Sequence, residues 1–157
     1  MKPADRQRLF DLRKALLHLH KTLLDWERAA YERVHGRAAA GELLKLIVED
    51  PQFAWLRPIS ELIVRIDQTM ETEDADGASD SSMEVEALIA RARDVVAPAT
   101  AHTPHAQRYL AALQEHPDAV AAPDDGLTLV GRQLRRVRTG PQQSEPAPGR
   151  AAGMDRG

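Results

Sequence analysis

The stretch LFDLRKALLHLHKTLLDWERAAYERV (residues 9–34) decides the fold, because its apolar residues recur at helical spacing from end to end. Residues seven positions apart form three columns, and at about 100° per residue these columns fill one broad arc of a helix. The columns are Leu9, Leu16, Leu23 and Ala30; Leu12, Leu19 and Trp26; and Phe10, Leu17, Leu24 and Tyr31. Pro3 suits a first helical turn and Gly36 an end, so we expect one helix of about 33 residues between them.

A column of polar residues lies inside this apolar arc. Arg13, His20 and Glu27 are also seven positions apart, so we expect all three to point toward the core. Buried polar groups cost free energy unless they are paired. The column is therefore a structural network, part of a functional site, or a polar strip at a subunit interface. Asp67, at the edge of a later helix, is the acidic group that we expect to face the column.

The rest of the chain indicates further helices separated by proline and glycine. We expect a second helix that is mostly buried, a turn closed by two prolines, and an acidic loop at 71–82. A capping-box pattern, Ser81 with Glu84, opens the helix that follows the loop. The expected helices cover residues 40–49, 58–72, 82–97, 104–116 and, more weakly, 127–138.

These elements predict an all-α fold. We expect an antiparallel helical bundle of about four main helices with a long N-terminal helix and a disordered C-terminal tail. A single domain would span residues 1–138, with 117–138 loosely attached to it. Residues 139–157 have no apolar periodicity and are expected to be disordered.

Composition narrows the class of protein. The chain has 157 residues, a net charge of −3 and no cysteine, which excludes disulfides and thiolate metal sites. No stretch approaches the roughly 18 apolar residues of a membrane span, and the N-terminus has no signal-peptide core. We therefore expect a cytoplasmic protein without membrane contact.

The segment DPQFAWLRP (residues 50–58) is the most distinctive one outside the long helix. Two prolines bracket Phe53 and Trp55, which gives a rigid turn with a large apolar surface, and Arg57 follows. The turn is either a corner that plugs one end of the bundle or a docking surface. We favour the corner, because aromatic side chains bury large apolar areas.

Two alternatives involve a ligand of a different class. A metal-binding bundle, either a hydrolase or a sensor, would use His20, Glu27 and Asp67, although the inward Glu-x-x-His motifs of di-metal bundles are missing. Weak nucleic-acid contact would use arginines near the C-terminus without interleaved aromatic residues. Those arginines are Arg132, Arg135, Arg136 and Arg138. We expect neither a metal nor another cofactor, and we do not expect nucleic-acid binding.

LHLHKTLLDWERAAYERVHG (17–36) and DPQFAWLRPISELIVRID (50–67) together resemble small bacterial all-α proteins that have no assigned activity. The resemblance covers about the first 70 residues. It implies a helical domain of a bacterial cytoplasm, and it implies no catalytic residue.

The sequence thus favours a non-enzymatic helical module that acts through protein contacts. The apolar arc of the first helix covers more of its circumference than one short chain is expected to bury. We therefore predict a homodimer, with a further protein partner as the open alternative.

Overall fold

A computed structural model describes residues 1–76, 82–98 and 100–115 of the chain. Every regular element within these ranges is helical, as predicted. In chain order the elements are α1 (Pro3–His35), α2 (Ala40–Glu49), the 3₁₀ helix η1 (Pro51–Leu56), α3 (Arg57–Asp76), α4 (Ser82–Val96) and α5 (Pro104–Glu115). The predicted helix at 127–138, the disordered tail and the four C-terminal arginines all lie outside the described residues.

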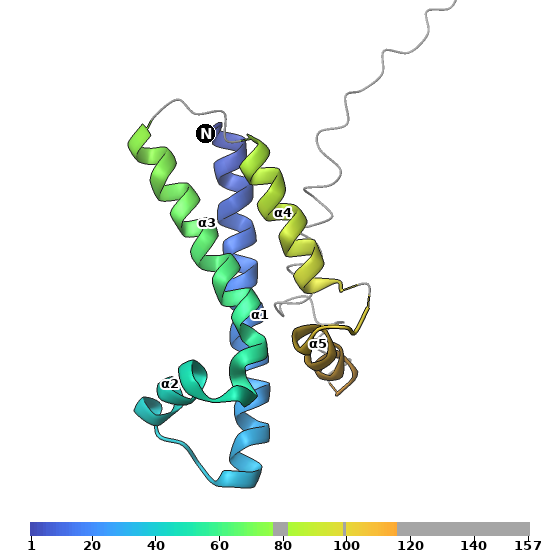
Figure 1. Cartoon of the computed structure of the whole chain (residues 1–157). Coiled ribbons are helices and arrows are strands. Elements are labelled where there is room, and N and C mark those ends of the chain that lie inside the picture. Colours follow the sequence, from blue (N-terminus) through green and yellow to red (C-terminus); the bar gives the residue numbers. More distant parts are fainter. Residues whose placement is uncertain (77–81, 99, 116–157) are drawn as a thin grey trace, which may run out of the picture.

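The long helix α1 is the spine of the molecule (Figure 1). It begins at Pro3 and ends at His35, close to the predicted bounds, and Gly36 follows with a φ of 84°. A positive φ of this size costs little conformational free energy only for glycine, which explains why the helix ends there. In Figure 1, α3 and α4 run alongside the upper part of α1, and α5 lies beside its lower part.

The core fills the space between α1, η1, α3, α4 and α5. Two columns of α1 supply one wall of this core, and the buried faces of η1, α3, α4 and α5 supply the rest. The fully buried large apolar residues are Leu9, Leu12, Leu16, Leu19, Phe53, Leu56, Ile59, Ile66, Val85, Ile89 and Tyr109.

Only half of the third apolar column of α1 packs against the core. Leu24 and Tyr31 are partly buried there, and the centroid of the Tyr31 ring lies 5.8 Å from that of Phe53. Phe10 is 52% exposed and Leu17 is 41% exposed, whereas Leu9 and Leu16 beside them are fully buried. The first half of this column therefore stays on the surface of α1.

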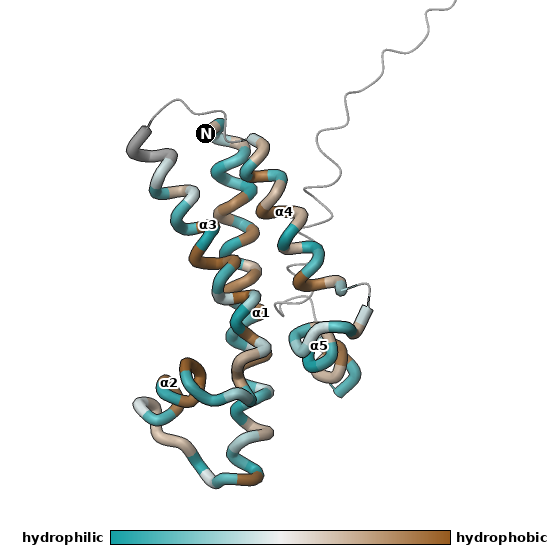
Figure 2. The backbone as a smooth tube through the Cα atoms, viewed as in Figure 1, coloured by the Kyte–Doolittle hydropathy of each residue, from teal (hydrophilic) through white to brown (hydrophobic). Residues whose placement is uncertain are grey.

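The prediction that α2 is mostly buried was wrong. No residue of α2 is buried, and Leu44 and Val48 are 65% and 64% exposed. Figure 1 shows the reason, because α2 lies beside the lower end of α1, away from α4 and α5. Figure 2 shows that it nevertheless carries apolar residues. Only one side of the helix packs against the core, through Leu43, Leu46 and Ile47.

The proline-bracketed turn forms η1. The Asp50 side chain accepts a hydrogen bond of 2.8 Å from the Gln52 backbone N–H, which caps the first turn after Pro51. Phe53 and Trp55 point into the core, and Arg57 at the junction with α3 is exposed.

The prediction of a loop over 71–82 was wrong for residues 71–76, which continue α3 to Asp76, and Ser82 begins α4. The stretch 71–76 contains neither glycine nor proline before Gly77, so nothing in its backbone breaks the helix. Residues 77–81, including the predicted capping residue Ser81, lie outside the described residues. Within the described part of the chain, no helix combines the length and the apolar character needed to cross a bilayer.

Candidate functional site

The polar column of α1 divides among three environments. Arg13 forms an ion pair with Asp67 of α3, and both side chains are 34% exposed. His20 is half-buried, and this burial lowers the pKa of its imidazole. Glu27 is fully buried. The structure thus brings Arg13 and Asp67 together and places Glu27 in a separate cluster.

Glu27 accepts four hydrogen bonds from three residues, which lie on two elements, η1 and α5. Arg108 of α5 donates two of them in a bidentate arrangement, from Nε to Oε2 and from an Nη to Oε1, each at 2.9 Å. Gln52 Nε2 and Trp55 Nε1, both from η1, donate the other two at 2.7 Å. Each carboxylate oxygen therefore receives two donors, so the buried charge is fully satisfied.

These donors decide the ionisation of Glu27. Burial alone would raise the pKa of its carboxyl group, but the hydrogen bonds from Arg108, Gln52 and Trp55 and the charge of Arg108 outweigh it and lower the pKa. The hydrogen bonds from Arg108 to Glu27, together with the negative charges of Glu27 and Glu115, raise the pKa of Arg108 against the effect of its own partial burial. The pair is therefore a charged one at neutral pH, and it ties α5 to α1 and η1.

Aromatic rings surround the pair. The Arg108 guanidinium lies 4.5 Å from the centroid of the Trp26 ring, within the range of a cation–π contact. Trp26 Nε1 donates to Glu115 Oε2 at 3.0 Å, and the Trp26 and Trp55 rings meet edge to face with centroids 6.2 Å apart. Trp26 and Glu27 of α1 thereby hold α5 at Arg108 and, through Trp26, at its last residue, Glu115.

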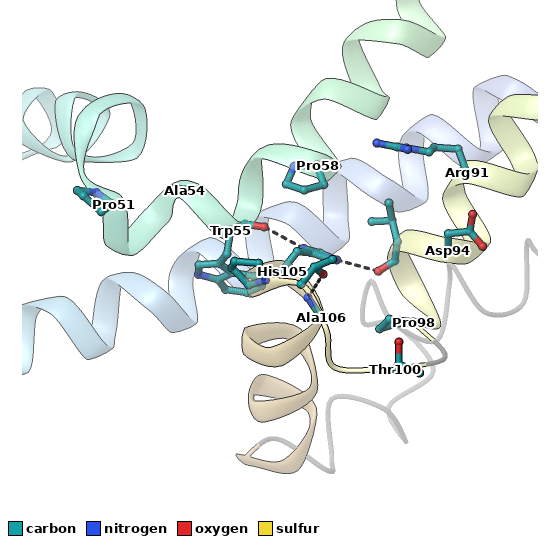
Figure 3. Close-up of a pocket in the computed structure, with 13 residues that line it drawn as sticks. Pro51, Ala54, Trp55, Pro58, Arg91, Asp94, Pro98, Thr100, His105 and Ala106 are labelled. Carbon is teal, nitrogen blue, oxygen red and sulfur yellow. Dashed lines mark hydrogen bonds between the residues drawn. The ribbon is translucent and has the colours of Figure 1, made fainter.

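His105 holds the beginning of α5 in place. Its side chain is buried between Trp55 and Tyr109, and the two rings have centroids 6.0 and 5.6 Å from the imidazole. Nδ1 lies 2.9 Å from the carbonyl oxygen of Trp55, and Nε2 lies 2.9 Å from that of Val95 (Figure 3). Because both nitrogens face carbonyl oxygens, this histidine serves as a clamp between η1, α4 and α5, and neither nitrogen points toward a ligand.

A pocket of about 720 Å³ opens beside His105, within the volume range that small-molecule sites occupy. Figure 3 shows its apolar wall on η1, including Ala54, and the side chains of Arg91 and Asp94 on α4. The residues that line it are Pro51, Ala54, Trp55, Pro58, Arg91, Asp94, Val95, Pro98, Thr100, Thr103, Pro104, His105 and Ala106. Thr103 already caps α5, since its hydroxyl accepts the Ala106 backbone N–H at 3.1 Å. The arrangement suits binding of a mainly apolar molecule.

The three candidate metal ligands do not form one site. Asp67 pairs with Arg13, and the carboxylate of Glu27 already accepts four hydrogen bonds. His20 lies on α1 between Arg13 and Glu27. Among residues 1–76, 82–98 and 100–115, no group of three or more His, Cys, Asp or Glu side chains is placed to hold a metal ion.

Sequence reasoning found Glu27 and Trp55 but missed Arg108, Gln52 and His105 as their partners. Arg108 could have been found, because a buried glutamate requires a cationic partner. Apart from the histidines, Arg108 is the one basic residue of the predicted helix at 104–116. Gln52 and His105 carried no such signal.

No family model, curated protein or solved structure matches the chain. We therefore infer function from the contacts of the molecule itself.

Proposed function

We propose that the protein is a non-enzymatic helical module that self-associates through the outer face of α1 and α3. This outer α1–α3 face consists of Phe10, Arg13 and Leu17 of α1 with Val64 and Asp67 of α3. The observation that supports it is the exposure of its apolar members, which is 52% for Phe10, 41% for Leu17 and 53% for Val64.

Helix geometry places these residues together. Phe10 and Leu17 stand three residues before and four residues after Arg13, so they are its neighbours on the surface of α1. Val64 stands three residues before Asp67 and is its neighbour on α3. The ion pair between Arg13 and Asp67 joins the two helices, and the apolar side chains flank it on both sides.

A second copy is the occupant that this face suits. Arg13 and Asp67 offer one positive and one negative group, so the pair can meet a second copy of itself with opposite charges facing each other. In one chain α1, α3 and α4 lie side by side (Figure 1), and a second copy would add helices against the open side of α1 and α3. The antiparallel bundle of about four main helices within each chain, expected from the sequence, is also part of this proposal.

The test compares two sets of variants by sedimentation velocity. Phe10→Glu combined with Leu17→Glu places two charges on the outer α1–α3 face, and we expect it to convert a dimer into a monomer. Val34→Glu is the matched control, because Val34 is a 78% exposed apolar residue near the far end of the same helix. A monomeric native chain, or equal dissociation of the control, would refute the proposal.

The pocket beside His105 favours a second candidate function, which is binding of a small apolar molecule without net charge. Arg91 and Asp94 on the pocket wall have opposite charges, and the η1 wall is apolar. Nile red, a neutral apolar dye, should bind saturably with one dye per chain. Ala54→Phe, which fills the pocket, should abolish this binding, whereas Ala29→Phe at an exposed position on α1 should not. Equal dye binding by both variants would rule out this pocket as the site.

A further inference from the structure

The ion pair at the centre of the outer α1–α3 face points to a specific way in which two copies meet. We infer that the two faces pack about a two-fold axis, so that Arg13 of each chain contacts the partner's Asp67. The inference rests on the proposed self-association and adds to it the residues that select the partner and its orientation.

The symmetry of a homodimer determines how the two ion pairs meet. A two-fold axis that lies in the plane of the interface and passes between Arg13 and Asp67 places each of these residues opposite the other residue of the second copy. The second copy of the pair then lies antiparallel to the first, with each guanidinium beside a carboxylate of the other chain. Packing without this reversal would set like charges opposite each other and would cost free energy.

The Arg13–Asp67 ion pair is accessible to a second copy. Both side chains are 34% exposed, so each retains surface on which a second opposite charge can approach. The pair is thus neither sealed in the core nor fully solvated. Dimer formation would cover it with Phe10, Leu17 and Val64 around it, which removes water and strengthens the attraction between the four charges.

A purely internal role for the ion pair makes a different prediction. If Arg13 and Asp67 only tie α1 to α3 within one chain, reversing both charges preserves the tie and leaves partner choice unchanged. If they also meet across the axis, the same double reversal creates a chain that pairs with itself and rejects the native chain.

The experiment therefore uses the double variant Arg13→Asp with Asp67→Arg, which keeps the internal pair and so protects folding. Differently labelled native and double-variant chains are mixed, and subunit exchange is followed by fluorescence energy transfer. We expect each chain to form homodimers and the mixed dimer to be at least about tenfold weaker, because two like-charge contacts replace two ion pairs. Free exchange between the two chains would overturn the inference.

The single reversals give a complementary result. Arg13→Asp alone and Asp67→Arg alone should each be monomeric at concentrations where the native chain is dimeric. An equimolar mixture of the two should form a heterodimer, because both contacts across the axis become attractive. The matched control reverses the exposed pair Lys21 and Asp25, whose side chains lie 2.7 Å apart on α1, and it should leave association unchanged.

The outcomes separate the two proposals. A native chain that stays monomeric refutes self-association itself. A native dimer that exchanges freely with the double variant, and whose single reversals still dimerise, leaves self-association standing and refutes the two-fold contact between Arg13 and the partner's Asp67.

Discussion

Replacing Glu27 with glutamine should loosen the attachment of α5 and lower the free energy of unfolding. Glutamine has nearly the same shape but only one acceptor oxygen, and the other position becomes an NH₂ donor. Each oxygen of Glu27 accepts one hydrogen bond from Arg108 and one from η1. The variant therefore leaves two donors facing an NH₂ group, whichever way its amide is turned.

The size of the effect follows from these contacts. A hydrogen bond to a charged group contributes about 1.5–3 kcal/mol net, so loss of two sets an upper value near 6 kcal/mol. Two factors reduce it. The Arg108 side chain is 39% exposed and can recover water, and the amide of Gln52 can turn to present its oxygen to the new NH₂ group. We therefore expect a loss of about 2–3 kcal/mol.

Urea unfolding followed by far-UV circular dichroism measures this loss. Tryptophan fluorescence adds a local probe, because Trp26 and Trp55 are the only tryptophans and both contact the network. Glu49→Gln is the control, since Glu49 is exposed and its ion pair with Lys45 spans 3.9 Å, so it should change stability by less than about 0.5 kcal/mol. A loss for Glu27→Gln as small as that of the control would refute the conclusion that Glu27 secures α5.

Three further outcomes follow from the same contacts. Because the pKa of Glu27 is lowered in the folded chain, ionised Glu27 stabilises the fold above its ordinary pKa of 4.5, and this stabilisation should be lost as the pH falls below that value. The free energy of unfolding of Glu27→Gln should therefore change less with pH in the acid range. Trp55→Phe keeps a ring but removes the indole donor, and it should cost about 1–3 kcal/mol in urea unfolding, with an unchanged stability counting against the hydrogen bond. His105→Leu removes the ring nitrogens that lie beside the carbonyl oxygens of Trp55 and Val95, and it should accelerate amide hydrogen exchange in α5 before that in α1. Uniform exchange across both helices would contradict the role of His105 in holding α5.

The sequence predicted those parts of the fold that depend on local pattern. The heptad spacing of α1, its first-turn proline and its terminal glycine are local, and the helix has the expected bounds. The burial of Glu27 was also predictable, because its column lies inside the apolar arc. Phe53 and Trp55 of η1 are both buried.

The errors arose where burial depends on a neighbour rather than on the residue itself. Phe10 and Leu44 have the side chains of core residues, yet no described helix covers them. Arg108 lies 81 positions from Glu27, so the ion pair exists only because α5 packs against α1. Apolar periodicity gives the face that a helix prefers to bury, but it does not give the number of helices available to cover that face.

Sedimentation equilibrium of the native chain tests the proposed function most directly. Self-association through the outer α1–α3 face should give a species of twice 17.4 kDa at micromolar concentrations that dissociates on dilution. A mass of 17.4 kDa across the whole concentration range would contradict it and would show that the outer α1–α3 face does not bind a second copy.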